Sequence, residues 1–147
     1  MGSEMCIRDS LSYLTLAEGS NPQDVFDAVC QIRSAKLPCP EDIPNAGSFF
    51  KNPIVSSDQY HRLLSDFPDI VCFKHDSGWK LAAAWLIEQR GWKDKVLDGV
   101  KVHQQQALVV TNPMRRSGAQ VLALATAIQQ DIKMCFSVNL EIEPTLY

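Results

Sequence analysis

The stretch Asn-Ala-Gly-Ser-Phe-Phe-Lys-Asn-Pro, residues 45–53, joins a glycine-serine step to two aromatic residues and a terminal Lys-Asn-Pro. Gly47 has no Cβ, so a substrate or a flat ring can approach the backbone closely at this point. Ser48 opens a segment that reads as a strand over residues 48–55 and is interrupted by Pro53. Because proline cannot donate a ladder hydrogen bond, we expect an edge strand or a bend there.

Helices are predicted on both sides of this stretch from their start signals. Upstream, Asn21-Pro22 places asparagine at an N-cap and proline at the first helical position. Downstream, Ser56 and Ser117 are each followed three residues later by glutamine, which is the pattern of a capping box. A further helix, rich in Ala and Leu, is expected over residues 80–90 and should end at Gly91. Four aromatic residues are expected in the core: Phe26, Phe67, Trp85 and Phe136.

Short strands are expected at residues 70–73, 106–111 and 138–142, the last because apolar and polar residues alternate along it. This order of helices and strands predicts an α+β fold, a single compact domain of mixed helices and strands. Residues 1–10 follow no periodic pattern and read as a non-native leader, which leaves residues 11–147 for the domain.

Composition narrows the class of protein further. The net charge of −3 argues against a nucleic-acid surface, and no apolar run reaches the roughly 20 residues that span a membrane. The five cysteines include no C-x-x-C pair, which argues against a zinc site or a disulfide framework and favours the cytoplasm. The three histidines lack metal-ligand spacing, so no metal site is predicted. Neither glycine-rich phosphate fingerprint, G-x-G-x-x-G or G-x-x-x-x-G-K-[ST], is present.

Residues 45–53 resemble the signature of the UDP-N-acetylenolpyruvoylglucosamine reductases, flavoenzymes that make UDP-N-acetylmuramate for peptidoglycan in the bacterial cell wall. The motif Lys-Leu-Ala-Ala-x-Trp-Leu-Ile at 80–87 and the motif Leu-Glu-x-Glu at 140–143 follow in the family's order. The resemblance implies the C-terminal, substrate-binding domain of a larger enzyme. It implies that the FAD-binding domain is missing, that the chain is truncated, and that NADPH is the co-substrate.

The resemblance implies catalytic roles for Ser48 and Glu143. In the family, the serine protonates the carbon of the enol intermediate, and the glutamate stabilises that intermediate or assists proton delivery. Without the family, Ser48 reads as a hydroxyl that satisfies a backbone group at a strand start. Glu143 then reads as an outward-facing strand carboxylate. Glu141 shares its face of the strand and is the residue most easily confused with it.

The resemblance also implies five substrate-binding residues: Lys36, Asn52, Lys80, Lys93 and Gln106. Ammonium groups suit the oxygens of a diphosphate or carboxylate, although most lysines are simply solvated. The asparagine either binds a phosphate or sugar oxygen or caps the turn before the following proline. No residue of this chain is assigned to cofactor or metal binding. Since the flavin carries the redox chemistry, we expect the chain alone to be inactive.

Two other classes of function are consistent with the sequence. One is a stand-alone sugar-nucleotide binding module without catalysis, which would need neither a proton donor nor a paired carboxylate. The other is a structural or interaction domain, in which the polar candidates would be scattered over the fold. Convergence of the candidates on one face would separate these alternatives. In every case we expect a monomer that binds neither nucleic acid nor membrane.

Overall fold

The computed structural model describes residues 21–145, so the predicted leader at residues 1–10 lies outside the described part. The helices in this range are α2 (Pro22–Lys36), α3 (Ser57–Asp66), α4 (Ala83–Gln89) and α5 (Gly118–Phe136). The strands are β1 (Asn45–Ser48), β2 (Ile54–Val55), β3 (Cys72–His75), β4 (Gly78–Leu81), β5 (Val96–Leu97), β6 (Val100–Val102) and β7 (Val109–Thr111). The predicted α+β class is confirmed. None of these helices is both long and apolar enough to cross a bilayer.

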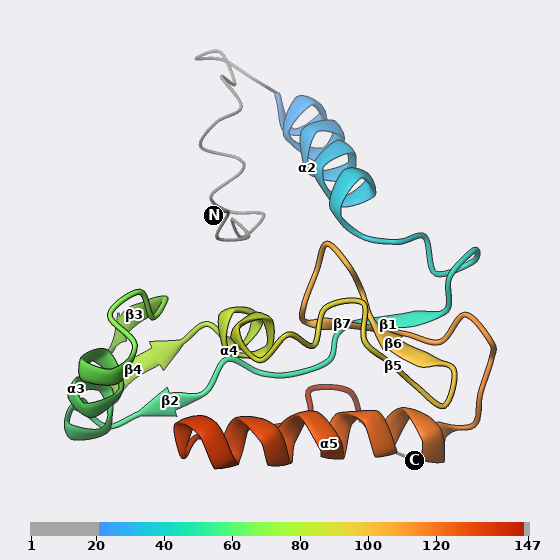
Figure 1. Ribbon diagram of the computed structural model, residues 1–147. Coiled ribbons are helices and arrows are strands. Elements are labelled where there is room, and N and C mark those ends of the chain that lie inside the picture. The colour runs from blue at the N-terminus through green and yellow to red at the C-terminus, as the bar shows by residue number, and fades with distance from the viewer. Residues whose placement is uncertain (1–20, 146–147) are drawn as a thin grey trace.

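The strands form two antiparallel sheets, one in the order β1-β7-β6-β5 and one in the order β2-β4-β3 (Figure 1). The chain passes directly from the first sheet to the second, since β1 and β2 are separated only by residues 49–53. The predicted strand at 48–55 is therefore two strands that belong to different sheets, with the predicted interruption between them. Residues 45–53 thus connect the two halves of the fold.

The helix starts predicted at Asn21 and Ser117 are confirmed by their caps. The Asn21 side-chain oxygen accepts from the Asp24 N–H at 3.0 Å, and the Asp24 carboxylate accepts from the Asn21 N–H at 3.0 Å. At the start of α5, the Ser117 N–H donates to the Gln120 side-chain oxygen at 3.0 Å. These side chains satisfy backbone N–H groups that have no partner within the helix, so the sequence signal and the structure have one physical cause.

The starts of α3 and α4 involve hydrogen bonds to residues that are distant in the sequence. Ser56 Oγ accepts from the Gln59 N–H at 3.2 Å, as predicted, but Gln59 Nε2 donates to the Ser137 carbonyl at 2.9 Å instead of turning back. Helix α4 begins at Ala83, whose N–H donates to Asn52 Oδ1 at 2.9 Å. A residue far away in the sequence therefore caps α4, and local sequence signals do not reveal this contact.

The boundaries predicted at Lys80 and Gln106 are wrong, and the strand predicted at 70–73 is β3, which spans Cys72–His75. Lys80 does not open a helix: it lies in β4, the central strand of its sheet, opposite Ile54 of β2 and Phe73 of β3. Pairing on both edges outweighs the helical propensity of the alanine-rich sequence that follows. Gln106 does not enter a strand either, because β7 starts at Val109 and the Gln106 carbonyl accepts from the Val109 N–H at 2.9 Å in the preceding turn.

A β-hairpin joins β5 to β6 and was not predicted. Its two-residue loop is Asp98-Gly99, with φ angles of 50° and 84°. Positive φ at both loop residues is the requirement of a type I′ turn, and Asp-Gly is a favoured sequence for that turn. The dipeptide was therefore a usable signal for this hairpin.

Helix α5 supplies much of the core. It runs along one side of the body (Figure 1), with Leu124, Ile128 and Ile132 fully buried. Of the predicted core aromatics, Phe136 is buried, and Phe67 and Trp85 pack against the core while partly exposed. Their rings contact one another, with centroids 4.8 to 6.3 Å apart.

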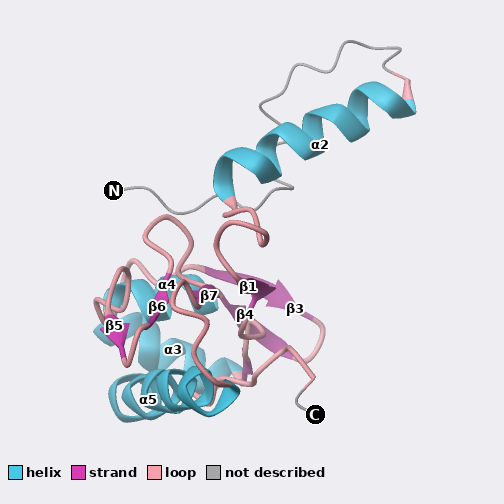
Figure 2. Ribbon diagram, turned by 90° about the vertical axis from the view of Figure 1, so that its right-hand side faces the viewer, coloured by secondary structure: helices cyan, strands magenta, loops and turns pink. Residues whose placement is uncertain are grey.

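Helix α2 stands away from the rest of the described residues in two perpendicular views (Figures 1 and 2). Phe26, predicted as a core residue, is 61% exposed, and Val25 is 38% exposed. The prediction for Phe26 is therefore wrong. Helical spacing identifies an apolar face, but it does not show what covers that face.

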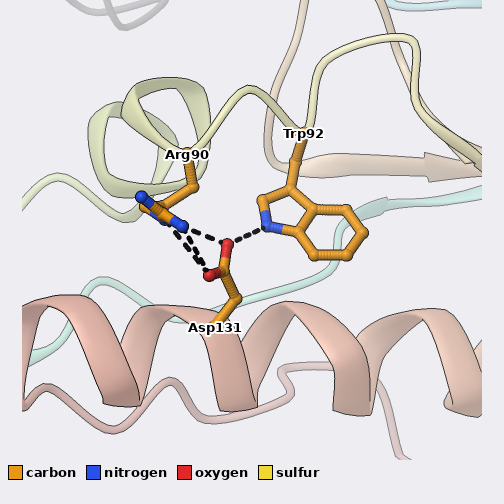
Figure 3. A network of polar contacts seen from close by, with 3 residues as sticks. All are labelled: Arg90, Trp92 and Asp131. Atoms are coloured by element: carbon orange, nitrogen blue, oxygen red, sulfur yellow. Dashed lines mark hydrogen bonds and ion pairs between the residues drawn. The ribbon is translucent and has the colours of Figure 1, made fainter.

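A polar network ties the end of α4 to α5 (Figure 3). The Arg90 guanidinium donates to both carboxylate oxygens of Asp131 at 2.9 to 3.2 Å, and the buried Trp92 indole N–H donates to Asp131 at 2.7 Å. The Arg90 hydrogen bonds hold the pKa of Asp131 below its ordinary value. Partial burial acts in the opposite direction, and the Trp92 hydrogen bond adds to the lowering.

This network predicts a pH-dependent contribution to stability. Because the folded pKa of Asp131 is depressed, the contribution is complete above the unfolded pKa of about 4 and is lost as the pH falls through the lower folded pKa. Asp131→Asn should therefore destabilise the protein at pH 7, with a deficit that shrinks towards pH 3. Urea unfolding at several pH values measures it. Asp69→Asn, at an exposed carboxylate, is the control, and equal changes in the two variants would contradict the assignment.

Candidate active site

Ser48 lies at the end of β1, at an irregular point of the sheet. The register of β1 against β7 shifts between Asn45 and Ser48, and Gly47 in that interval has φ of 71°. Such a local irregularity re-aims the side chains next to it. Ser48 is exposed, whereas the two residues after it, Phe49 and Phe50, are both buried. Ser48 is thus exposed to solvent directly before two residues whose side chains pack in the core.

Among the described residues, the hydroxyl of Ser48 makes one long hydrogen bond. Its Oγ donates to the Phe50 carbonyl at 3.3 Å, which is beyond the usual O–H···O distance. A proton held this weakly can be redirected to a substrate at little cost. The local backbone is held against β7 and the residue before it, because Ser48 pairs with Val109 and the Phe49 N–H donates to the Leu108 carbonyl at 2.8 Å.

The C-terminal segment pairs with the residues that follow Ser48. The Glu143 N–H donates to the Phe49 carbonyl at 3.0 Å, and the Lys51 N–H donates to the Glu141 carbonyl at 2.9 Å. Between these two bonds, Phe50 and Ile142 form an isolated antiparallel bridge. Glu143 is therefore hydrogen-bonded to the immediate neighbour of Ser48, although the two residues are far apart in the sequence.

The predicted strand at 138–142 keeps its alternation but forms a single bridge. Val138 and Leu140 are buried, whereas Asn139 and Glu141 are exposed. The burial pattern predicted from the sequence is confirmed for these residues. Only Ile142 makes a bridge, so the segment is an extended edge and not a full strand.

The two carboxylates of this segment differ in their partners. Lys51 Nζ forms an ion pair with Glu141, and both side chains are largely exposed. Glu143 is also exposed, and within residues 21–145 no side chain forms an ion pair or hydrogen bond with its carboxylate. The two carboxylates therefore differ in their side-chain partners among the described residues.

Several substrate-binding candidates are attached to the same stretch. Asn52 is exposed, and its Oδ1 is occupied by the Ala83 N–H, which leaves its amide N–H groups for other partners. Lys80 is half-buried and pairs with Ile54. Ile54 follows Asn52 by two residues in the sequence. Gln106 precedes Leu108, whose carbonyl binds the Phe49 N–H, so its turn adjoins the same stretch.

The described contacts of Lys93 are with residues outside this group. Lys93 Nζ forms an ion pair with Glu88 at 3.0 Å, and the Lys93 backbone forms an isolated bridge with Val102 of β6. Lys36 is the last residue of α2, and its side chain lies outside the described part. Within residues 21–145 no group of three or more side chains could hold a metal ion.

Comparison with known proteins identifies the family. Residues 38–147 match the family described as UDP-N-acetylenolpyruvoylglucosamine reductase, C-terminal domain. The chain belongs to this family. Helix α2 and Lys36 precede the matched region, whereas Ser48, Glu143 and the other candidates lie within it.

Curated relatives carry the corresponding name. A protein of Burkholderia vietnamiensis (strain G4 / LMG 22486) is 50% identical over 128 residues, which is 86% of this chain and 37% of that protein. One of Burkholderia cenocepacia (strain HI2424) is 51% identical over 128 residues, with the same coverage of each chain. One of Paraburkholderia phymatum (strain DSM 17167 / CIP 108236 / LMG 21445 / STM815) is 52% identical over 124 residues, 84% of this chain and 36% of that protein. All three are named UDP-N-acetylenolpyruvoylglucosamine reductase, and the chain spans little more than a third of their length.

A pocket opens beside Gly47, at the start of the family domain. Its volume is about 530 Å³, and its walls come from the end of α2 and from residues 37–40 and 45–47. Asn45 shapes this wall: its Nδ2 donates to the Ile43 carbonyl at 2.8 Å and its Oδ1 accepts from the Gly47 N–H at 3.0 Å. Sequence reasoning missed this role, although asparagine two residues before glycine is a signal of such a side-chain-closed turn.

Proposed function

We propose that this chain is the substrate-binding part of a flavin- and NADPH-dependent reductase that converts UDP-N-acetylenolpyruvoylglucosamine to UDP-N-acetylmuramate in peptidoglycan synthesis. Membership of the family and the names of the relatives support this reaction. The observation that carries the proposal is the hydrogen bond from the Glu143 N–H to the Phe49 carbonyl at 3.0 Å, which joins the backbone of one candidate catalytic residue to the neighbour of the other. A binding module without chemistry would not require that juxtaposition.

Ser48 is proposed to protonate the substrate. Hydride addition to one carbon of the enolpyruvyl double bond leaves an enol or enolate that must accept a proton at the other carbon. A hydroxyl is a weak acid, but a carbanion-like centre is a strong base, so an aimed hydroxyl suffices. The weak contact to Phe50 at 3.3 Å leaves the Ser48 proton transferable, and the paired backbone fixes where it points.

Glu143 is proposed to stabilise the enol or to assist delivery of the proton through Ser48. Its carboxylate is exposed and makes no side-chain pair within residues 21–145, so it can turn towards a bound substrate. The neighbouring Glu141 carboxylate instead forms an exposed ion pair with Lys51. We therefore assign the catalytic role to Glu143 and not to Glu141.

The remaining candidates are proposed to bind the substrate: Lys36, Asn52, Lys80, Lys93 and Gln106. Lysine ammonium groups suit the diphosphate or the carboxylate, and the two amides suit sugar or phosphate oxygens. Lys93 would have to exchange its partner Glu88 for the substrate. Arg33 lines the pocket beside Gly47 and is a further cation there.

FAD is not assigned to this chain. The sequence has neither glycine-rich phosphate loop, G-x-G-x-x-G or G-x-x-x-x-G-K-[ST], so no residue of this chain is proposed to bind the diphosphate of FAD. We propose that the part of the longer protein outside this chain binds the flavin, which supplies the hydride that NADPH provides. We further propose that the protein is a cytoplasmic monomer.

The purified chain should bind no FAD and should consume no NADPH. A hybrid reductase tests whether this chain supports the proposed reaction when a flavin-binding part is present. In it, this chain replaces the matching 128 residues of the Burkholderia vietnamiensis relative. We expect NADPH oxidation that depends on UDP-N-acetylenolpyruvoylglucosamine, followed by absorbance at 340 nm, with the unmodified relative as the positive control.

Two results would overturn the proposal. One is a yellow protein with a flavin spectrum after dialysis of the chain alone. The other is a folded hybrid that binds FAD and is reduced by NADPH, yet never reduces the enolpyruvyl substrate.

A further inference from the structure

The segment that carries Glu143 is held along both of its edges. On one edge, the Glu141 carbonyl and the Glu143 N–H bond to the backbone of residues 49–51. Backbone groups of an extended chain alternate in direction, so the Leu140 carbonyl faces the opposite edge. There Gln129 Nε2, on α5, donates to the Leu140 carbonyl at 2.8 Å. Gln129 thus supplies the bond that a neighbouring strand would otherwise make.

We propose that Gln129 is a positioning residue for the Glu143 carboxylate. The inference rests on the proposed function of Glu143 and adds the element that fixes its place. Leu140 is only 5% exposed, so loss of the donor would leave its carbonyl buried and without this partner. The segment would then be free to shift away from α5, and Glu143 would move relative to Ser48.

Helix α5 is a suitable base for such a contact. It spans 19 residues, and the neighbour of Gln129, Ile128, is fully buried in the core. The hydrogen bond from Gln129 is partly buried, and its acceptor is a backbone carbonyl of the segment itself. Two other polar contacts to the segment, Lys51 with Glu141 and Lys133 with Asn139, lie on the exposed surface, where such contacts contribute little.

The first measurement is amide hydrogen exchange on the chain itself. Gln129→Met keeps the approximate length and volume of the side chain but removes the donor. We expect the Glu143 N–H to exchange about tenfold faster, as loss of one hydrogen bond to a buried carbonyl implies. Gln130→Met, at the exposed neighbour on α5, should leave it unchanged. Gln129→Lys restores a donor and should recover most of the protection. The Leu124 amide in α5 reports whether the fold is intact.

The second measurement uses the hybrid reductase. Gln129→Met should slow reoxidation of the reduced flavin by the enolpyruvyl substrate about five- to tenfold. Flavin reduction by NADPH and the substrate dissociation constant should stay within about twofold, and Gln129→Lys should recover much of the lost rate. A purely structural role predicts no such selectivity for one half-reaction.

The outcomes separate this inference from the proposed function. Unchanged exchange at Glu143 in Gln129→Met would overturn the positioning role. So would faster exchange without slower reoxidation, provided that Glu143→Gln itself slows reoxidation. If Glu143→Gln leaves reoxidation unchanged, the catalytic role of Glu143 fails and the positioning role fails with it.

Discussion

Ser48→Ala in the hybrid reductase should slow reoxidation of the reduced flavin by the enolpyruvyl substrate at least about 100-fold, the lower range for loss of general acid catalysis. Flavin reduction by NADPH should remain nearly intact, because that half-reaction needs no proton at the substrate carbon. Substrate affinity should change little, since the hydroxyl acts mainly as charge develops in the transition state. Stopped-flow absorbance of the flavin measures both half-reactions separately.

Two further variants sharpen this test. Ser48→Cys should recover part of the rate, because a thiol can also donate a proton. Ser65→Ala, at an exposed serine of α3 whose Oγ donates to the His61 carbonyl at 3.0 Å, is the matched control and should react at the wild-type rate. If Ser48→Ala reoxidised as fast as the wild type, the serine would be structural, and Glu143 would be the first candidate for the acid.

Local features of the fold could be predicted because their causes are local. The caps at Asn21 and Ser117 satisfy backbone groups within three residues, so the sequence contains both partners of each bond. The alternation at 138–142 likewise reflects one buried and one exposed face of a single segment. These predictions depend on spacing alone and are confirmed.

Features that depend on distant partners could not be predicted in the same way. Helix α4 starts at Ala83 because Asn52 caps it, and Lys80 lies in a strand because Ile54 and Phe73 pair with it. Phe26 is exposed although its spacing marks it as part of an apolar face. For Ala83 and Lys80, the deciding partner is distant in the sequence. For Phe26, spacing within the helix does not show whether another described residue covers the side chain.

The candidate site shows the same division. The resemblance pointed to Ser48 and Glu143 individually, but composition and spacing did not distinguish Glu143 from Glu141. In the structure the two differ in their contacts: the Glu143 N–H donates to the Phe49 carbonyl, whereas the Glu141 carboxylate pairs with Lys51. The catalytic roles themselves stay predictions, because geometry shows which groups can meet a ligand and kinetics must show what they do.

Gly78→Ala should be among the most destabilising single substitutions in the chain. Gly78 opens β4 with φ of 142°, a conformation that residues with a side chain rarely adopt. A Cβ built there would lie 2.2 Å from the Val55 carbonyl oxygen and 3.2 Å from its carbon, both backbone atoms of β2. Relief of this clash requires β2 and β4 to separate or the turn after His75 to change.

The expected loss is about 2–6 kcal/mol of unfolding free energy, because backbone strain and overpacking each cost about 1–3 kcal/mol. Urea denaturation followed by tryptophan fluorescence measures it. Gly118→Ala is the matched control: Gly118 begins α5 and nothing lies within 4 Å of a Cβ there. That variant should be neutral or up to about 1 kcal/mol more stable, since alanine loses less chain entropy than glycine on entering a helix. A Gly78→Ala protein within about 1 kcal/mol of the wild type would show that β2 and β4 do not approach at Gly78 as closely as the structure requires.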